Sequence, residues 1–295
     1  MAIQKIRKAV IPAAGFGTRF LPITKAMPKE MLPIVDKPVM QYIVEEIINS
    51  GIDEILVISG HAKRSIENHF DSSSQLEHHL YESGKTELLK EIQRISDIKI
   101  HYTRQKYMRG TGDAVLCARD FIDDEPFAVI LGDDVVYTGS GEPALKQLLN
   151  QYERTGSTIV GCRKLDEKHE GACKVIDGAP TAEPGLFRVH SIAKKAEEDL
   201  VPGSYATIGR YILTPEIFDI LEMTRPGEGG EIHLTDALRV LAKNGSVYAY
   251  NFNGVRYNTG DKLGYLEATV EFALRRKDLG PQFKEYLSGV IEGLK

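Results

Sequence analysis

The 295-residue chain has few cysteines, no long apolar run and no excess of basic residues. Its three cysteines, Cys117, Cys162 and Cys173, are odd in number and show no C-x-x-C spacing. This pattern argues against both a disulfide framework and a zinc cluster. Such cysteine usage fits a reducing compartment, so we expect a cytoplasmic protein.

The sequence also argues against membrane and nucleic-acid partners. Residues 1–8 include basic side chains but run directly into a strand-like segment, with neither the apolar core nor the cleavage site of a secretory signal. Because no apolar run approaches about 20 residues, no segment is expected to span a membrane. The net charge of −5 argues against a nucleic-acid surface, so any anionic ligand must meet local positive charge.

Alternating strand-like and helical segments predict an α/β fold. Short apolar runs occupy residues 9–11, 54–59, 99–103, 127–131 and 158–162, with helical patterns between them. The clearest helix covers residues 39–50 and stops at Gly51. This alternation predicts βαβ units in a mainly parallel, mixed central sheet with helices on both faces. In such sheets, ligands bind at the carboxyl ends of the strands.

The second half of the chain is richer in strand patterns. Strands are expected at residues 172–176, 187–192, 205–213 and 247–252, and helices after Pro215 and Thr235 and over residues 263–276 and 283–294. A polar helical stretch, residues 71–96, is expected to hold one apolar face against the body. Its adjacent His78 and His79 point apart on a helix, so we interpret them as solvated rather than as a metal pair.

One stretch, residues 10–42, organises the rest of the chain. A strand leads into a turn at Gly15 and Gly17, and such turns present backbone N–H groups to phosphate oxygens. The loop that follows is basic and contains prolines that rule out a continuous helix: Arg19, Lys25 and Lys29, with Pro22, Pro28, Pro33 and Pro38. An ordered irregular loop of this length usually has a function. The alternative is a proline-rich surface loop with chance glycines.

Two common phosphate loops are excluded for this stretch. A dinucleotide fingerprint requires a small residue where Phe20 stands. A Walker A loop requires Gly-Lys-Ser/Thr where this chain has Gly17-Thr18-Arg19.

Two further turns follow strand-like runs. Gly110 and Gly112 form a second glycine turn after Gln105, either for a ligand or only for the geometry of the turn. Asp133 and Asp134 end an apolar strand. Because buried carboxylates need partners, this pair indicates a cation or a sugar hydroxyl, with a solvated turn as the alternative.

Over nearly its whole length, the sequence resembles the sugar-phosphate nucleotidyltransferase family. The resemblance is carried by Gly17-Thr18-Arg19, Pro28-Lys29-Glu30-Met31-Leu32-Pro33, Asp36-Lys37-Pro38 and residues 231–237 and 257–265. Residues 28–33 are similar to those of the bacterial members that use UTP and glucose 1-phosphate. The family implies a Rossmann-like nucleotidyltransferase fold in a single domain over residues 1–295. Within it we expect a nucleotide-binding half (1–135), a smaller β-rich sugar-binding part (136–262) and C-terminal helices (263–295).

The resemblance implies that glucose 1-phosphate attacks the α-phosphorus of UTP, with Mg²⁺ as cofactor, giving UDP-glucose and pyrophosphate. It assigns nucleotide binding to Ala13, Ala14, Gly15, Gly17, Glu30, Gln105, Gly110 and Asp133. It makes Arg19 and Lys29 the catalytic residues, which grip the triphosphate and neutralise the α-phosphate region. It assigns Mg²⁺ to Asp133 and Asn258, and the sugar phosphate to Asp134, Lys174, Ala193 and Lys194. It also implies a homodimer or homotetramer, for which the amphipathic helices after Leu263 offer a surface.

Three positions depart from the family pattern, all in the sugar and metal half. Ala193 stands where the family has a glutamate for sugar hydroxyls, Lys174 where it has a glycine, and Asn258 where it has a second metal carboxylate. These departures leave open weak activity, a non-catalytic nucleotide-binding paralogue, or a different sugar 1-phosphate or nucleotide. Asn258 is either a weak metal ligand or a turn cap, with Asp134 then supplying the second carboxylate.

Overall fold

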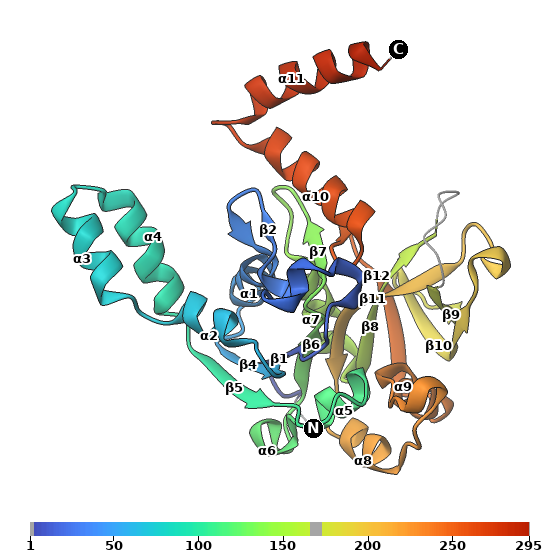
Figure 1. Cartoon of the computed structure of the whole chain (residues 1–295). Coiled ribbons are helices and arrows are strands. Elements are labelled where there is room, and N and C mark those ends of the chain that lie inside the picture. Colours follow the sequence, from blue (N-terminus) through green and yellow to red (C-terminus); the bar gives the residue numbers. More distant parts are fainter. Residues whose placement is uncertain (1–2, 166–172, 295) are drawn as a thin grey trace.

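The computed structural model describes residues 3–165 and 173–294. In these residues the central sheet has the order β5 (Ile100–Arg104), β4 (Glu54–Ser59), β1 (Lys8–Ala13), β6 (Phe127–Ile130), β11 (Tyr205–Leu213), β8 (Thr158–Lys164), β12 (Val247–Asn251), β10 (Leu186–Lys195) and β9 (Cys173–Pro180). Strands β5, β4, β1 and β6 run parallel, whereas β11 enters antiparallel between β6 and β8 (Figure 1). The sheet is therefore mixed, as predicted.

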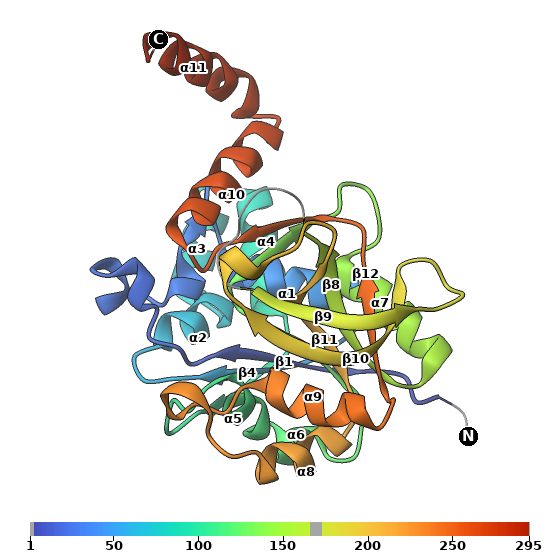
Figure 2. The same ribbon diagram turned by 90° about the vertical axis from the view of Figure 1, so that its right-hand side faces the viewer.

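Helices cover both faces of the sheet (Figure 2). One face carries α1 (Val39–Asn49), α2 (Arg64–Phe70) and α7 (Ala144–Thr155), and the other carries α5 (Thr111–Leu116), α6 (Arg119–Ile122), α8 (Glu216–Met223) and α9 (Leu234–Lys243). Successive strand residues serve opposite faces, so that Ile11 packs in the first apolar cluster and Val10 in the second. Each face therefore has its own buried core.

The β-rich part of the molecule closes on itself. Strand β9 pairs with β10, β10 with β12, β12 with β8 and β8 with β11, while β9 also pairs with β11. These strands form a closed ring of pairings, which brings β9 beside the middle of the central sheet. The strand expected at residues 172–176 runs from Cys173 to Pro180, and Ala172 lies outside the described residues.

Two short antiparallel pairs lie outside the central sheet. The loop after β1 contains β2 (Pro33–Ile34) and β3 (Lys37–Pro38), which pair immediately before α1. Strand β7 (Asp134–Tyr137) pairs with β13 (Val255–Asn258), and this register sets Asp134 opposite Asn258. The second pair thus brings two of the predicted site residues onto neighbouring strands.

A helical hairpin projects from the body (Figure 1). It consists of α3 (Ser74–Glu82) and α4 (Thr86–Ser96), whose described side chains include one buried residue each, Leu80 and Ile95. Leu76 and Leu88 are exposed. The expected apolar face of residues 71–96 meets the body only at the end of α4, where Ile95 joins the first apolar cluster; elsewhere the two helices pack mainly on each other.

The C-terminal helices lie at the opposite end of the chain. Helix α10 (Lys262–Arg275) packs on the body through Phe272, which contacts the rings of Tyr42, Tyr137 and Tyr257. Helix α11 (Gly280–Gly293) then extends away from the body (Figures 1 and 2). Within residues 3–165 and 173–294, no helix has both the length and the apolar character needed to cross a bilayer.

Candidate active site

The loop after β1 is held in one conformation by short turns and internal hydrogen bonds. It contains 3₁₀ turns at Thr18–Phe20, Ile23–Lys25 and Lys29–Met31. Gly17 has a φ of +67°, and a Cβ there would lie 3.1 Å from Thr24 Cγ2. The Thr24 hydroxyl donates to the Gly17 carbonyl at 2.8 Å. The loop is therefore ordered and irregular, as its prolines predict.

A first cavity, of about 390 Å³, opens at the carboxyl ends of β1 and β6. Its lining includes Lys29 and most of the predicted nucleotide residues: Ala14, Gly15, Gly17, Glu30, Gln105, Gly110 and Asp133. Ala13 is instead buried as the last residue of β1. The fold thus gathers the glycine loop, the second glycine turn and the end of β6 around one space.

Gln105 and Gly110 form one wall of the first cavity. The Gln105 amide nitrogen donates to the Gly110 carbonyl at 3.1 Å and to Asp113 Oδ2 at 2.7 Å, which fixes the orientation of the amide. Gly110 has a φ of +96°, and a Cβ there would lie 2.6 Å from the Ile232 carbonyl oxygen. Turn geometry alone therefore requires this glycine, whatever ligand the wall meets.

Glu30 reaches the same cavity from a buried ion pair. Its carboxylate is 1% exposed and accepts a hydrogen bond from the Lys63 amine at 2.8 Å. Burial raises the pKa of Glu30, although the charges of Lys63 and Lys29 oppose that shift. The other oxygen, Oε1, is buried without a hydrogen-bond partner among the described residues. Glu30 therefore retains an acceptor that a ligand N–H or O–H group can satisfy.

Asp133 lies at the centre of the site. The Lys29 amine contacts Asp133 Oδ2 at 2.5 Å, and the Thr259 hydroxyl donates to the Asp133 carbonyl at 2.9 Å. Burial acts to raise the pKa of Asp133, but the charges of Lys29, Arg256 and Arg19 hold it below its usual value. Desolvation likewise opposes the charge on Lys29, whose pKa is nevertheless raised by Asp133 and Glu30. Both groups are therefore charged at neutral pH.

A second cavity, of about 240 Å³, shares Leu131 and Asp133 with the first. Its walls come from the end of β6, from β8, β9, β11 and β13, and from the glycine loop: Arg19, Asp134, Arg163, Cys173, Lys174, Ala206, Thr207, Gly209, Tyr211, Arg256 and Asn258. Arg19 also donates to the Gly260 carbonyl at 3.4 Å. Two anionic ligands bound in these cavities would meet at Asp133.

The predicted sugar residues lie at different distances from the second cavity. Lys174 lines it, and Asp134 lines it while paired with Arg256 Nε at 2.6 Å and with the Gly209 N–H at 3.2 Å. Asp134 is 5% exposed, so these partners occupy it. Ala193 and Lys194 lie on β10, opposite Val175 and Lys174, and are not among the described lining residues.

Asp133 and Asn258 present two oxygens that suit a hard divalent cation. A Cβ added at Gly260 would lie 2.9 Å from Asp133 Oδ2 and 3.1 Å from Asn258 Oδ1, so both oxygens face the same glycine. The Asn258 oxygen also accepts the Gly260 N–H at 3.1 Å, which is a turn-capping bond. The described residues contain no group of three His, Cys, Asp or Glu suited to a metal. Substrate oxygens or water molecules would therefore complete the coordination shell of a cation bound here.

Several residues of the site were missed from the sequence: Arg163, Tyr211 and Arg256 line the second cavity, and Lys63 pairs with Glu30. Lys63 follows β4, which ends at the same edge of the sheet as β1, and this placement could have identified it. Arg163 and Tyr211 face the second cavity because β11 enters the sheet antiparallel beside β8. No local pattern predicts that pairing.

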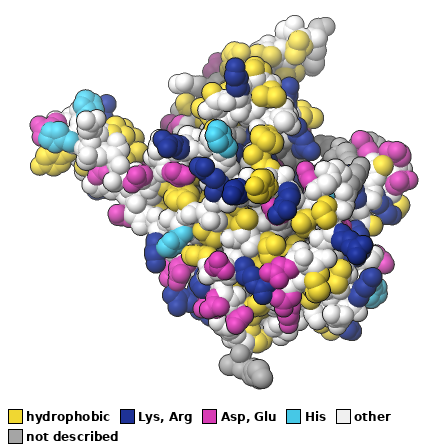
Figure 3. Space-filling model, turned by 60° about the horizontal axis from the view of Figure 1, so that its bottom comes forward, with side chains coloured by type: hydrophobic (Ala, Val, Ile, Leu, Met, Phe, Trp, Pro, Cys, Tyr) yellow, Lys and Arg dark blue, Asp and Glu magenta, His cyan; other side chains and the backbone are white. Residues whose placement is uncertain are grey.

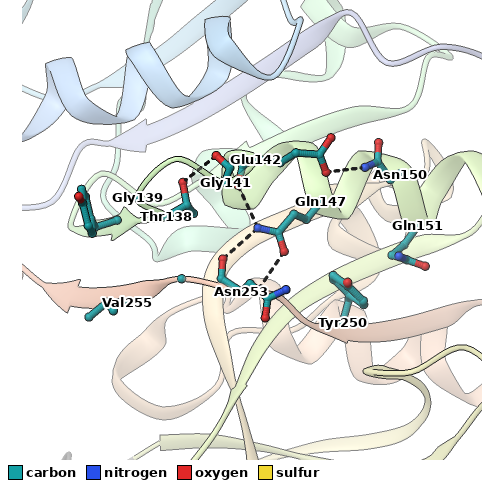
Figure 4. Close-up of a pocket in the computed structure, with 12 residues that line it drawn as sticks. Thr138, Gly139, Gly141, Glu142, Gln147, Asn150, Gln151, Tyr250, Asn253 and Val255 are labelled. Carbon is teal, nitrogen blue, oxygen red and sulfur yellow. Dashed lines mark hydrogen bonds between the residues drawn. The ribbon is translucent and has the colours of Figure 1, made fainter.

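A row of Lys and Arg side chains crosses the middle of one face, although the chain is acidic (Figure 3). Another cavity, of about 550 Å³, lies between α7 and the turn after β12 (Figure 4). There Gln147 Nε2 donates to the carbonyls of Glu142 and Asn253 at 3.0 and 2.9 Å. This amide ties the two segments together, away from Asp133.

Comparison with known proteins identifies the chain's relatives. The family model "Nucleotidyl transferase" matches residues 8–274. A UTP--glucose-1-phosphate uridylyltransferase of Bacillus subtilis (strain 168) is 49% identical over 290 residues, 98% of each chain. One of Streptococcus pneumoniae serotype 4 is 48% identical over 286 residues, 96% of each chain.

Solved structures lead to the same group. A UDP-glucose pyrophosphorylase complexed with UDP-glucose is 42% identical with a TM-score of 0.82, covering 92% of this chain and 100% of that one. A UTP-bound UGPase from Acinetobacter baumannii is 35% identical with a TM-score of 0.87, covering 96% and 98%. The predicted family and nucleotidyltransferase fold are confirmed. The chain belongs to the nucleotidyl transferase family, among the UTP–glucose-1-phosphate uridylyltransferases.

Proposed function

We propose that this chain transfers the uridylyl group of UTP to glucose 1-phosphate, giving UDP-glucose and pyrophosphate. One observation carries the proposal: Asp133 lies on the wall shared by two cavities, with Lys29 in contact with it and Arg19 on the second wall. The relatives named for this reaction, and the solved structures with UTP and UDP-glucose, support a nucleotide and a sugar as substrates.

The reaction requires positioning and charge neutralisation more than covalent chemistry. A phosphate oxygen of glucose 1-phosphate forms a bond to the α-phosphorus of UTP. The bond between the α-phosphorus and its bridging oxygen to the β-phosphorus breaks, and pyrophosphate leaves with the electron pair. Holding two anions in line and stabilising the charge that develops provides most of the rate enhancement. Lys29 and Arg19 are the groups proposed for this task.

The first cavity is proposed as the nucleotide site. Backbone groups of Ala14, Gly15 and Gly17 would hold the phosphates, as glycine turns after strands commonly do. Gln105 and the unpartnered oxygen of Glu30 would meet the base or ribose. Gly110 borders the same wall. Ala13 would contribute to the nucleotide site only indirectly, as part of β1.

The metal is proposed to be Mg²⁺, held by Asp133 and Asn258 together with phosphate oxygens. Nucleotidyltransferases of this family typically use a divalent metal. When bound, Mg²⁺ would neutralise phosphate charge and favour ionisation of the groups it contacts. The contact with Lys29 keeps the Asp133 carboxylate ionised, which is the form that binds a metal. Asn258 supplies a neutral oxygen in place of a second charge.

The second cavity is proposed as the acceptor site, with Asp134, Lys174, Ala193 and Lys194 as its sugar-phosphate residues. Lys174 and Asp134 line it, which supports their assignment. Lys194 lies opposite Lys174 on β10, and is proposed to reach the sugar's phosphate from that side. Ala193 leaves the acceptor hydroxyls without the carboxylate expected there.

Three expectations about the whole molecule remain predictions. The free state of Cys117, Cys162 and Cys173 supports the proposed cytoplasmic location. The exposed apolar side chains of α10 and α11 support a homodimer or homotetramer, including Leu263, Leu266, Ile291 and Leu294. One continuous sheet, with β5 at one edge and β9 at the other, supports a single domain.

The test is pyrophosphate release from UTP and glucose 1-phosphate in the presence of Mg²⁺. We expect release that requires both substrates and that is strongly reduced in Asp133→Asn. UTP binding without turnover would instead favour a non-catalytic nucleotide-binding protein. Identical rates with other nucleoside triphosphates would contradict the assignment to UTP.

A further inference from the structure

We infer that Lys63 is a positioning residue of the nucleotide site: it holds the Glu30 carboxylate so that Oε1 accepts a hydroxyl of the ribose, which makes the site selective for ribonucleotides. The inference rests on the proposed function and adds to it the means by which the sugar of the nucleotide is recognised. Lys63 itself does not need to touch the nucleotide, because it acts through Glu30.

Glu30 and Lys63 form an ion pair that is almost fully buried. Their side chains are 1% and 7% exposed, and the Lys63 amine donates to Glu30 Oε2 at 2.8 Å. A buried carboxylate needs such a partner, because desolvation disfavours its charged form. The other nearby cation, Lys29, is directed to Asp133 at 2.5 Å. The hydrogen bond from Lys63 therefore fixes both the charge and the orientation of Glu30.

The backbone after β4 brings Lys63 to this position. Lys63 lies between the end of β4 and the start of α2. A Cβ at Gly60 would lie 2.6 Å from the Ala14 carbonyl oxygen, so this glycine allows the segment after β4 to approach the glycine loop. Ala62 has a φ of +61°, a left-handed conformation that is unfavourable for a residue with a side chain. This course of the backbone places the Lys63 side chain against Glu30 instead of in solvent.

Glu30 offers one unused acceptor to the nucleotide. It lines the first cavity, whereas Lys63 lines a neighbouring cavity of about 330 Å³. Oε2 of Glu30 is taken by Lys63, and Oε1 is buried without a hydrogen-bond partner among the described residues. Because an ionised carboxylate can only accept hydrogen bonds, the group that satisfies Oε1 must be a donor. The nucleotide can supply an O–H of the ribose or an N–H of the base.

The position of Glu30 favours the ribose. Its Cγ would lie 3.1 Å from a Cβ at Gly132, the residue before Asp133, and Glu30 itself follows Lys29. Lys29 and Asp133 are the proposed surroundings of the α-phosphate, and the ribose is the next unit of the nucleotide. The Gln105 amide nitrogen already donates within the wall of the cavity, so its oxygen remains for an N–H of the base. The ribose hydroxyls are thus the donors left for Glu30.

The experiment compares UTP with 2′-deoxy-UTP and 3′-deoxy-UTP at saturating glucose 1-phosphate. We expect kcat/KM for at least one deoxy analogue to be about thirtyfold below that for UTP, the scale of a hydrogen bond to a charged group. Lys63→Met should reduce this discrimination about tenfold, because a buried carboxylate without its cation takes up a proton and forms a weaker bond. If Lys63→Met does not fold, Lys63→Gln takes its place with the same expectation. The two analogues identify which hydroxyl Glu30 binds.

Two further variants separate positioning from a general structural effect. In a Glu30→Gln background, Lys63→Met should not change the discrimination further, since Lys63 acts through Glu30. This combination leaves no unpaired charge in the buried site, so the fold should be retained. The matched control is Lys8→Met, which removes a largely buried lysine that pairs with Glu125 at 3.3 Å at the start of β1. Lys8→Met should leave the discrimination at the parental value.

Three results would overturn the inference. The first is equal kcat/KM for UTP and both deoxy analogues, and the second is unchanged discrimination in the folded Lys63→Met variant. The third is a change in the ratio of UTP to CTP in place of the ratio of UTP to its deoxy analogues, which would put Glu30 against the base. Absence of turnover with UTP would contradict the proposed function instead. In that case calorimetry with UTP and the deoxy analogues decides the inference, since the tighter binding of UTP must be lost in Lys63→Met.

Discussion

The amine of Lys29 lies 2.5 Å from Oδ2 of Asp133, and this contact joins residues 104 positions apart in the chain. It attaches the proline-rich loop to the carboxyl end of β6, where the two cavities meet. Although partial burial opposes both charges, the contact holds both groups in their charged forms. The loop and the carboxylate therefore act as one unit, and substitutions in either should affect the reaction before they affect the fold.

Arg19→Ala should reduce turnover while leaving the fold intact. Arg19 is exposed on the glycine loop and lines the second cavity, so its guanidinium is available to phosphate oxygens. Loss of an interaction that strengthens in the transition state costs about 3 kcal/mol, or roughly a hundredfold in rate. Steady-state kinetics, with circular dichroism as a check of folding, measure the effect.

The control for Arg19 is Lys25→Ala. Lys25 is an exposed cation of the same loop and is outside the described lining of both site cavities. The Lys25→Ala substitution should therefore change the turnover rate little. A folded Arg19→Ala variant with parental turnover and substrate affinity would remove Arg19 from the site.

Asn258→Asp should lower the Mg²⁺ concentration needed for half-maximal rate and raise turnover. Asn258 Oδ1 and Asp133 Oδ2 face the same glycine, so an aspartate would add a charge beside the metal position. The substituted carboxylate can still accept the Gly260 N–H, so the turn is retained. Titration of activity with Mg²⁺ measures the shift.

Asn253→Asp is the control for this titration, because Asn253 lies in the turn before β13 and lines the separate cavity near α7. Its Mg²⁺ curve should match the parent. If Asn258→Asp also titrates like the parent, Asn258 only caps its turn. Asp134 would not then take over as a metal ligand, since Arg256 and the Gly209 N–H occupy it.

Glu46→Gln should destabilise the fold without touching the site. Glu46 of α1 pairs with Arg210 of β11 at 2.7 Å, and Arg210 is fully buried. Removing the carboxylate leaves a buried cation without its counter-charge, which costs about 3 kcal/mol or more. Denaturant unfolding measures the loss.

The comparison for Glu46 is Glu54→Gln, which breaks a surface pair with Arg7. That pair should contribute about 1 kcal/mol at most. Equal stabilities of the two variants would show that solvent reaches Arg210.

Ile291→Asp and Leu294→Asp together should shift the protein toward the monomer. Both side chains are exposed near the end of the chain, at 57% and 82%, and an apolar helix surface of this kind is usually covered by a second copy. Light scattering at micromolar concentration measures the mass. Leu76→Asp on the projecting hairpin is the control. A monomeric parent would disprove the oligomer outright.

The first half of the fold was predictable because its patterns are local. Helix 39–50 and the strand at 54–59 lie within one residue of α1 and β4, since apolar spacing, Pro38 and Gly51 mark their ends. Ala14, Gly15, Gly17 and Glu30 all lie on the loop after β1, so the loop itself brings them to one cavity.

The acceptor half was harder to predict because its walls are assembled from strands distant in sequence. The sequence pattern located strand 205–213 but not its antiparallel position between β6 and β8. Arg163 faces the cavity only through that pairing, and Arg256 reaches it from β13, which pairs with β7 outside the central sheet; both were therefore missed. The outward course of α3 and α4 was also unpredictable, because apolar spacing does not distinguish packing on the body from packing on a neighbouring helix.

The central position of β11 has a consequence for how the chain is made. Its partner β6 is complete at residue 130, yet that edge stays open until the ribosome has added residue 213. An unpaired apolar edge invites association with other chains, and pairings between distant residues form slowly. A fragment ending near residue 135 should therefore aggregate, and split versions of the protein should recover only when both pieces are produced together.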